Sequence, residues 1–529
     1  MPKTSPFTAP DRKQIAERGS TLERVLEQIE ALRKGFPFVK LVRPCTLGDG
    51  ITLVPDAEVA ELAALSDEAV AEGRFMKFVP ASGAASRMFK SLLAVHGHGA
   101  ERLKLLAGNG NAAADDDEKA FVEFAQNLRK FAFFEHLKEA LKRKGQDIET
   151  LTTEREYLPV LEGVLFEAGL GYALLPKGLI LFHDYPGRAR TAFEEHLVES
   201  REHARDAQGK VLIHFTVAQE HREQVCEYLQ SVLSDYETSG THFEITYSVQ
   251  KSSTDTIAVD LKNCPFRDKS GSLVFRPAGH GALLENLEEL RADLVFIKNI
   301  DNIVPDHMKE ETYKYKKILG GYLVRLQKQI FSWIKTLEDS DPDEKQIESI
   351  HRMAGPQIVR VDETAFSRLE TGEQIAVLLR SLNRPIRVCA MVPNRGEPGG
   401  GPFWIQGTEG ISLQIVEKAQ IDRENPVQKG LLSQATHFNP VDMVCGLRDR
   451  NSIPYRFAEF TDPQMGFITR KSKDGKELKS LEVPGLWNGA MAEWITVFLE
   501  VPLHTFNPVK TVNDLLRPEH QPQKRFLDE

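Results

Sequence analysis

Residues 275–302 read FRPAGHGALLENLEELRADLVFIKNIDN, and this stretch decides the fold class. Its apolar run at 293–297 (DLVFI) predicts a buried strand, and polar residues follow the run at once. Asp301 is therefore expected at the end of a strand, the place where ligands bind in open α/β sheets. A carboxylate there suits Mg²⁺, which takes oxygen ligands and bridges phosphates. A polar cap between strand and loop is the alternative.

The turn that opens this stretch places His280 between Gly279 and Gly281. Because glycine has no side chain, the backbone there can approach a flat base or a sugar. The imidazole can then hydrogen-bond a hydroxyl or a phosphate. A tight turn that carries a surface histidine is the alternative.

Other short apolar runs predict further strands, and helical segments separate most of them. These runs cover residues 75–79, 179–182, 210–217, 243–249 and 386–392. Strands spaced by helices predict an α/β protein with a mostly parallel central sheet and flanking helices.

Changes in composition divide the chain. We expect an N-terminal helical segment at 1–72, an α/β core at 73–392 and a C-terminal subdomain at 393–529. An amphipathic helical insertion at 90–173 interrupts the core. The stretch PNRGEPGGGP (393–402), rich in glycine and proline, marks the last boundary.

Within the N-terminal segment, apolar residues at 20–34 recur on one helical face. Ser20 with Glu23 resembles a capping box, and Gly35 resembles a C-terminal stop. These signals predict a helix with defined ends.

Composition excludes several classes of protein. The chain has 529 residues, of which 41% are hydrophobic and 27% charged, as in ordinary soluble globular proteins. Its 77 acidic and 67 basic residues give a net charge of -10, which argues against a nucleic acid polymer as the main partner. No apolar run of about 18 residues occurs, so neither a membrane span nor a signal region is expected. No feature of the sequence specifies an oligomeric state.

The cysteines indicate a reducing compartment, and we expect a cytoplasmic protein. They are odd in number, dispersed, and form no CxxC pair, which disfavours a disulfide scaffold and a cysteine zinc site. Their positions are Cys45, Cys226, Cys264, Cys389 and Cys445.

A second stretch, VPASGAASRMFK at 79–90, resembles the turn from a strand into a helix. Unpaired backbone N–H groups converge in such a turn, so it is a natural anion site. Arg87 can add positive charge. Tight packing of strand on helix is the alternative, because the stretch matches neither GxxxxGK[ST] nor GxGxxG. The small residues that would let a phosphate approach the backbone are Ser82, Gly83, Ala84, Ala85 and Ser86.

Four stretches together resemble the UDP-glucose and UDP-N-acetylhexosamine pyrophosphorylase family, and they occur in that family's order. The resemblance covers residues 75–305 and 505–516, and it suggests a related bacterial branch rather than either named enzyme. The four stretches are VPASGAASRMFK (79–90), PKGLILF (176–182), the stretch at 275–302, and TFNPVKTVNDLL (505–516).

The resemblance implies a Rossmann-like nucleotide-diphospho-sugar transferase core of the GT-A type. It implies a Mg²⁺-dependent nucleotidyltransferase that joins a nucleoside triphosphate, with UTP favoured, to a sugar 1-phosphate and releases pyrophosphate. The alternative is a nucleotide-sugar-binding or regulatory protein of the same fold that has lost turnover. Retention of Lys177, Asp301 and Lys510 favours the enzyme.

The resemblance also implies roles for single residues. Lys177 completes the triphosphate loop, Lys510 meets the sugar phosphate and the triphosphate, and Arg87 supports catalysis. Asp301 binds the metal. Ser82, Gly83, Ala84 and Ser86 hold phosphate, whereas Gly279, His280, Gly281 and Asn299 contact the nucleotide or the sugar. Gln250 lies in a stretch that the resemblance does not match, YSVQKSSTDTIAVD (247–260), and two interpretations stay open for that stretch: it binds base or sugar, or it forms a polar hairpin.

Two expectations follow for the structure. The family's loop normally has two or three glycines, whereas this loop has only Gly83, and each added methyl group narrows the approach to phosphate. If the insertion at 90–173 merely interrupts a site, Gly83 and Lys177 must lie close together. A second metal ligand is not identified; Asp442 and Asp514 are the candidates.

Overall fold

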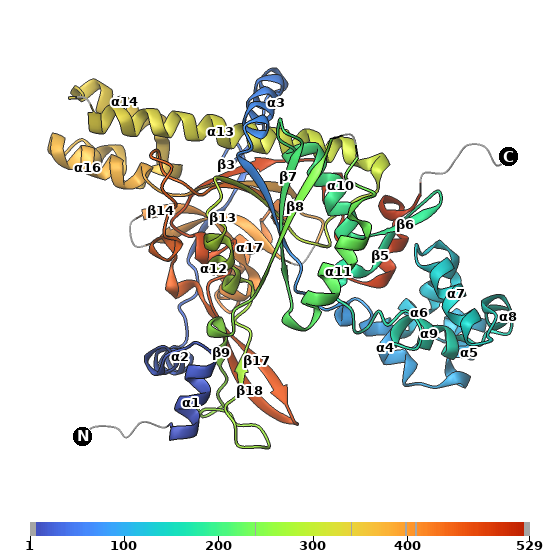
Figure 1. Cartoon of the computed structure of the whole chain (residues 1–529). Helices are drawn as coiled ribbons and strands as arrows, with labels where there is room; N and C mark the ends of the chain where they lie inside the picture. The colour runs from blue at the N-terminus through green and yellow to red at the C-terminus, as the bar shows by residue number, and fades with distance from the viewer. Residues whose placement is uncertain (1–6, 239, 340, 397–398, 408–409, 523–529) are drawn as a thin grey trace. The chain divides into compact units, whose positions relative to one another are not determined.

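Close contacts divide the chain into two units. Unit 1 comprises Met1–Ala69, Gln250–Ile297 and Ile318–Val501, and unit 2 comprises Val70–Val249, Lys298–Lys317 and Pro502–Glu529. The computed structural model, drawn in Figure 1, describes residues 7–238, 240–339, 341–396, 399–407 and 410–522.

The centre of unit 2 is a parallel arrangement of three strands in the order β4-β7-β8. Nearly every side chain of β7 is buried, as expected for a parallel strand covered on both faces. These strands confirm the predictions at 75–79, 210–217 and 243–249. Their bounds are β4 Phe75–Pro80, β7 Lys210–Val217 and β8 His242–Val249, and α10 Ala192–Ala204 and α11 Arg222–Leu233 belong to the same unit.

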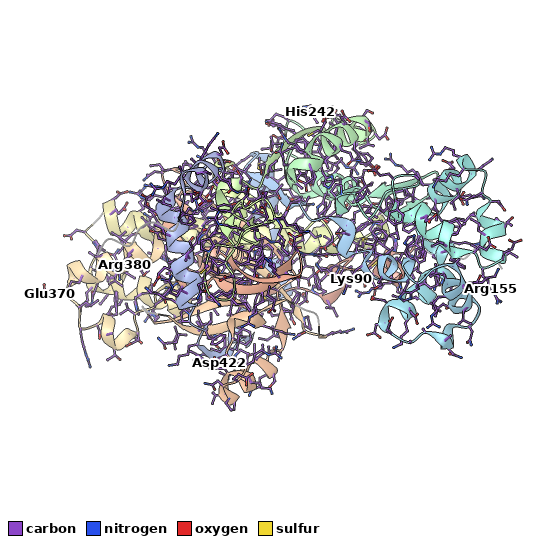
Figure 2. The ribbon with its side chains drawn as sticks, turned by 90° about the horizontal axis from the view of Figure 1, so that it is seen from below. Lys90, Arg155, His242, Glu370, Arg380 and Asp422 are labelled. Carbon is purple, nitrogen blue, oxygen red and sulfur yellow. The ribbon has the colours of Figure 1, made fainter. Side chains whose placement is uncertain are left out.

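The insertion is helical, as its amphipathic pattern predicted. In α7, Phe134, Leu137 and Leu141 are buried at spacings of three and four residues. Figure 1 shows these helices gathered in one cluster, and Arg155, labelled in Figure 2, lies between the last two of them. They are α4 Lys90–His96, α5 Ala100–Gly108, α6 Asp116–Gln126, α7 Phe134–Arg143, α8 Ile148–Thr153 and α9 Tyr157–Leu165.

The strand predicted at 179–182 is misplaced. A 3-10 turn occupies Lys177–Leu179, and β5 (Leu181–Tyr185) pairs antiparallel with β6 (Arg188–Thr191) in a separate two-stranded sheet. The turn is fixed by packing, because a Cβ on Gly178 would lie 2.3 Å from the ring of Phe193.

In unit 1 the largest run of paired strands has the order β2-β3-β19-β12-β16-β11. β12 pairs parallel with β19 and antiparallel with β16, and β3 pairs parallel with both β2 and β19. Parallel pairs predominate in this run and in β4-β7-β8, which confirms the α/β class. The bounds are β2 Thr46–Leu47, β3 Gly50–Thr52, β11 Leu294–Lys298, β12 Ile386–Pro393, β16 Asp442–Gly446 and β19 Ile495–Glu500.

Smaller sheets complete unit 1. One has the order β1-β13-β14, β9 pairs with β10, β17 pairs with β18, and β15 pairs with β12. Their bounds are β1 Leu41–Pro44, β9 Thr256–Ile257, β10 Phe275–Arg276, β13 Gly400–Gly407, β14 Gly410–Glu417, β15 His437–Phe438, β17 Phe467–Lys473 and β18 Lys476–Glu482.

The N-terminal helix prediction is confirmed with a different cap. Thr21, rather than Ser20, accepts the backbone N–H of Arg24, and Gly35 ends the helix at a φ of 77°. The helices of unit 1 are α1 Ala9–Glu17, α2 Leu22–Lys34, α3 Asp56–Ala71, α12 Leu283–Glu289, α13 Lys309–Asp339 (from Ile318), α14 Glu344–Ile358, α15 Glu363–Phe366, α16 Thr371–Leu382 and α17 Pro426–Ser433. Among the described residues, no helix has both the length and the apolar character needed to cross a lipid bilayer.

The contact-based division differs from the boundary expected at 393–402. Residues on both sides of that loop belong to unit 1, because β12 before it pairs with β19 after it. The division falls instead after Val501, and the stretch that contains Lys510 belongs to unit 2.

Candidate functional site

The two ends of the insertion lie side by side. Ala84 and Pro176 form an antiparallel bridge, and the Lys177 backbone N–H donates to the Gly83 carbonyl at 3.1 Å. The expectation that Gly83 and Lys177 lie close together is therefore confirmed. The loop after β4 and the lysine form one local surface in unit 2.

Gly83 has no packing reason to be glycine. It lies exposed with an ordinary φ, and a Cβ built on it would meet nothing within 4 Å. An open glycine next to small residues leaves the backbone accessible to a ligand. Most of the other predicted loop residues are also accessible: Ala84, Ser86 and Arg87 are exposed, and Ser82 is half-buried. Ala85 is the exception, because it is buried and its backbone N–H donates to the Leu175 carbonyl at 2.9 Å.

The turn that carries Asp301 lies beside the end of β4. The Ile300 backbone N–H donates to the Pro80 carbonyl at 3.3 Å, and His196 Nε2 donates to the Ile300 carbonyl at 3.2 Å. Asn299, which was expected to contact a ligand, precedes this turn and is half-buried. These two hydrogen bonds fix the position of the Asp301 turn beside the loop that follows β4.

The C-terminal stretch reaches the same turn. The Val509 backbone N–H donates to the Asp301 carbonyl at 3.1 Å, and the Asn507 backbone N–H donates to Asn302 Oδ1 at 3.0 Å. These bonds bring Lys510 to Asp301 across a separation of 209 residues.

Asp514 fixes the backbone at Lys510. Its Oδ2 accepts the backbone N–H groups of Lys510 and Thr511, both at 2.7 Å, and its Oδ1 pairs with Arg517 at 2.6 Å. Because both oxygens are occupied, Asp514 is a capping residue and an unsuitable metal ligand.

Three charges meet at the centre of the site. Lys177 Nζ lies 2.7 Å and Lys510 Nζ 3.0 Å from the same oxygen, Asp301 Oδ2. The Lys177 side chain is 12% exposed and that of Lys510 is 51% exposed, so one lysine is fixed in the wall and the other faces solvent. Two ammonium groups against one carboxylate leave an excess positive charge, which suits an anionic ligand.

Burial and charge act in opposite directions on these groups. Burial alone would raise the pKa of Asp301, but Lys510 and Lys177 outweigh it and lower the pKa below its usual value. Burial lowers the pKa of Lys177, and Asp301 only partly compensates. The ionised form of Asp301 is therefore stabilised, whereas the charged form of Lys177 would be stabilised by any further negative charge nearby.

Asp301 also offers one free metal ligand. Its Oδ1 is buried and has no hydrogen-bond partner among the described residues. Mg²⁺ typically takes one or two carboxylates and completes its shell with phosphate and water, so a single carboxylate oxygen fits it. Within the described part of the chain, no group of three or more His, Cys, Asp or Glu side chains is arranged to hold a metal. Asp442, the other candidate ligand, belongs to unit 1.

A buried charge cluster behind the site escaped the sequence analysis. Glu199 accepts from Lys77 Nζ at 3.1 Å and from Lys298 Nζ at 2.8 Å, and all three side chains are at most 1% exposed. Lys77 lies in β4, which leads into the loop, and Lys298 precedes the Asp301 turn. Lys77 and Lys298, which accompany two apolar runs, were a signal that the sequence offered. The sequence did not show that both lysines pair with Glu199 of α10.

His280 lies in unit 1 and is held by its surroundings. Its Nε2 donates to Glu417 Oε1 at 3.3 Å, its Nδ1 accepts the Leu486 backbone N–H at 2.9 Å, and its ring stacks on Trp487 at 3.9 Å between centroids. Both ring nitrogens are engaged, so the role of His280 in ligand binding stays a prediction.

Packing accounts for the two flanking glycines. A Cβ on Gly281 would lie 2.0 Å from the Pro484 carbonyl oxygen, and Gly279 adopts a φ of 81°. Gln250 donates to Asp255 Oδ1 at 3.4 Å. A nucleotide-binding role for these residues stays a prediction.

Fold and site together define an α/β protein in which two lysines and one carboxylate meet beside the loop that follows β4. Residues 8–521 match the family model described as "Domain of unknown function (DUF4301)", and the chain belongs to that family. Comparison with curated protein sequences gives no match.

Several solved structures are similar over most of the chain. The uridine diphosphate N-acetylglucosamine pyrophosphorylase from Trypanosoma brucei is 13% identical with a TM-score of 0.48, covering 97% of this chain and 82% of its own. The UDP-glucose pyrophosphorylase from Leishmania major is 11% identical with a TM-score of 0.45, covering 96% of this chain and 79% of its own. At these values the similarity carries no conclusion about the activity of this chain.

Proposed function

We propose that the chain is a nucleotidyltransferase that forms a nucleotide-sugar and pyrophosphate from a nucleoside triphosphate, with UTP favoured, and a sugar 1-phosphate. The observation that carries the proposal is the convergence of Lys177 and Lys510 on Asp301 beside the open loop at Gly83. These residues come from the four stretches that resemble the UDP-sugar pyrophosphorylases. We extend the proposal to a nucleotide-diphospho-sugar transferase core of the GT-A type.

The reaction joins two anions. A sugar 1-phosphate oxygen attacks the α-phosphorus of the triphosphate, the bond from that phosphorus to the bridging oxygen breaks, and pyrophosphate leaves with the electron pair. The attacking oxygen is already ionised near neutral pH, so the site needs no strong general base. It must align the two anions and neutralise their charge.

The residues divide this task. The backbone of the loop around Gly83 faces the triphosphate, with Arg87 adding charge from the exposed side. Lys177 is mostly buried and held by Asp301, so its ammonium neutralises phosphate at a fixed position. Lys510 is half-exposed and contacts both substrates from the solvent side. A lysine suits this role because its ammonium needs no bidentate geometry.

Asp301 Oδ1 would hold Mg²⁺ once a triphosphate supplies the remaining ligands. When bound, the ion neutralises phosphate charge and orients the leaving pyrophosphate. Because two ammonium groups already contact the same carboxylate, Asp301 binds the ion alone only weakly. We therefore expect Mg²⁺ and triphosphate to bind together.

Pyrophosphate release tests the proposal. Purified protein with Mg²⁺ is incubated with a panel of nucleoside triphosphates and sugar 1-phosphates, and one pair should release pyrophosphate well above either substrate alone. The Lys177→Ala/Lys510→Ala variant provides the background rate. Binding of a nucleotide-sugar without any pyrophosphate release would support the binding or regulatory protein instead.

A further inference from the structure

Unit 1 contains a cavity of about 360 Å³ that the proposed reaction does not use. The hairpin of β13 and β14 forms one side and α17 the other. Pockets that hold small ligands begin at about 300 Å³, so the cavity admits a small organic molecule.

The floor of this cavity is apolar. Phe403 and Val416 are at most 1% exposed and belong to one apolar cluster, against which Leu432 of α17 packs. Phe403 is in β13 and Val416 is in β14, so their positions are fixed by strand pairing. The half-buried side chains of Leu432 and Ala435, which pack against this cluster, are the part of the floor that the body of a bound ligand would contact.

The rim is cationic. Lys418, Arg423 and Lys429 line the cavity, and their exposed side chains make no ion pair or hydrogen bond with any described residue. The described lining residues include no Asp or Glu, although the chain as a whole has a net charge of -10.

Three acidic residues adjoin these cations in the sequence, and none of them is among the described residues that line the cavity: Glu417, Asp422 and Glu424. Glu417 Oε1 accepts hydrogen bonds from His280 and Asn488. Asp422, labelled in Figure 2, precedes Arg423, and its Oδ1 accepts the backbone N–H groups of Glu424 at 3.0 Å and Asn425 at 3.3 Å. It therefore shapes the turn into α17. Lys418, Arg423 and Lys429 therefore line an otherwise apolar cavity without an acidic partner among the described residues.

We propose that this cavity is a second binding site, for a small organic phosphate with an apolar or planar body. The phosphate contacts Lys418, Arg423 and Lys429, and the body lies over Leu432 and Ala435. Cations on flexible side chains suit a phosphate without imposing one geometry. The site lies within unit 1 and is independent of the lysine–carboxylate centre of unit 2.

Phenyl phosphate is a suitable probe because it joins one aromatic ring to one phosphate. Calorimetric titration is performed on the full chain with Lys177→Ala/Lys510→Ala, which removes the anion centre of unit 2. We expect one molecule bound per chain. Adding Lys418→Ala/Arg423→Ala/Lys429→Ala should weaken binding by at least about tenfold, since each exposed ion pair contributes up to about 1 kcal/mol.

The matched control removes the same three residue types elsewhere. Lys142→Ala/Arg143→Ala/Lys144→Ala lies on the exposed end of α7 and should change the affinity by less than about twofold. Inorganic phosphate should bind at least about tenfold more weakly than phenyl phosphate, because it cannot use the floor. The proposal is overturned if phenyl phosphate does not bind, if both triple variants act alike, or if the two probes bind equally.

Discussion

Lys177 Nζ lies 2.7 Å from Asp301 Oδ2, although 124 residues separate the two positions in the chain. Lys177 follows the C-terminal end of the insertion, and Asp301 lies in the turn formed by Asn-Ile-Asp-Asn (299–302), so the contact joins these two parts of the chain. A pair of charges this close in a buried setting fixes both side chains, and the second lysine then adds the excess charge. The centre is thus assembled before any ligand arrives.

Lys510→Ala should reduce turnover by about two to three orders of magnitude while leaving the melting temperature nearly unchanged. An ammonium about 4 Å from a phosphate gains roughly 4 kcal/mol at an effective dielectric near 20, before desolvation is subtracted. The Lys510 side chain is 51% exposed, so little packing is lost. Pyrophosphate release and thermal melting are measured on the same preparation. Lys142→Ala is the control, and a large drop in melting temperature with normal turnover would make Lys510 structural.

Gly83→Ala should raise the KM for the triphosphate by about tenfold and leave stability within about 0.5 kcal/mol. The added methyl group meets no protein atom within 4 Å, so its effect falls on a ligand approaching the backbone. Gly372→Ala is the matched control, because its Cβ is equally free of neighbours and belongs to helix α16 of unit 1. Equal kinetics for the two variants would show that the loop does not contact the triphosphate.

Asp301→Asn should lower turnover by at least about a hundredfold, because it removes the charge that holds the metal while keeping the shape of the side chain. In the wild type, Mg²⁺ should bind measurably only when a triphosphate is present. Calorimetry with and without the triphosphate checks the second statement. Strong binding of Mg²⁺ alone would contradict it.

The same variant tests the pKa of Asp301 through stability. Since the folded pKa is lower than the ordinary 3.8, the carboxylate stabilises the fold above that value, and the contribution is lost as the pH falls through the folded pKa. The wild type should therefore be more stable than Asp301→Asn at pH 7, and the difference should shrink below about pH 4. Asp116→Asn, at a side chain that is 99% exposed, is the control substitution at a surface carboxylate.

Lys77 should make stability rise with pH. Burial, reinforced by Lys298 and Lys316 and opposed by Glu199, lowers the pKa of Lys77 from 10.5 to about 7. Between those values the unfolded chain binds the proton that the folded chain has released, so raising the pH from 7 to 10.5 favours the folded state.

Urea unfolding of the wild type and of Lys77→Met at several pH values measures this effect. The wild type should gain stability relative to the variant across that window, because other titrating groups are shared. A difference that stays constant with pH would refute the assignment of the shift to Lys77.

The sequence could predict strands that are uniformly apolar and capped by polar residues. The runs at 75–79, 210–217 and 243–249 match β4, β7 and β8 to within one residue at each end. The buried strands β4 and β7 leave a local apolar signal, whereas the mostly half-buried or exposed β8 is indicated by its aromatic and β-branched residues. The run at 179–182 failed, since its turn is set by the ring of Phe193 rather than by local preference.

The candidate site was predictable only in part. Motif order gave Lys177, Asp301 and Lys510, and the structure brings the three together. The capping role of Asp514 is local, since Thr511 and Asp514 form a capping box, a sequence signal that the prediction did not use. The buried Glu199 cluster depends on partners 122 and 99 residues away, for which a single sequence holds no signal.

The bridge between Ala84 and Pro176 has an evolutionary consequence. Because this bridge joins the two ends of the insertion, the segment between them can change in length while Ala84 and Pro176 keep their positions. The free-energy cost of loop closure rises by only about 0.6 kcal/mol for each doubling of the segment's length. Parts of the insertion that contact nothing else are thus open to replacement, shortening or growth in descendants of this chain. Helix α6 is an exception, because Asn513 Nδ2 donates to the Ala120 carbonyl and to Glu123 Oε2, both at 2.8 Å, so selection acts on α6 and on the stretch that carries Lys510 together.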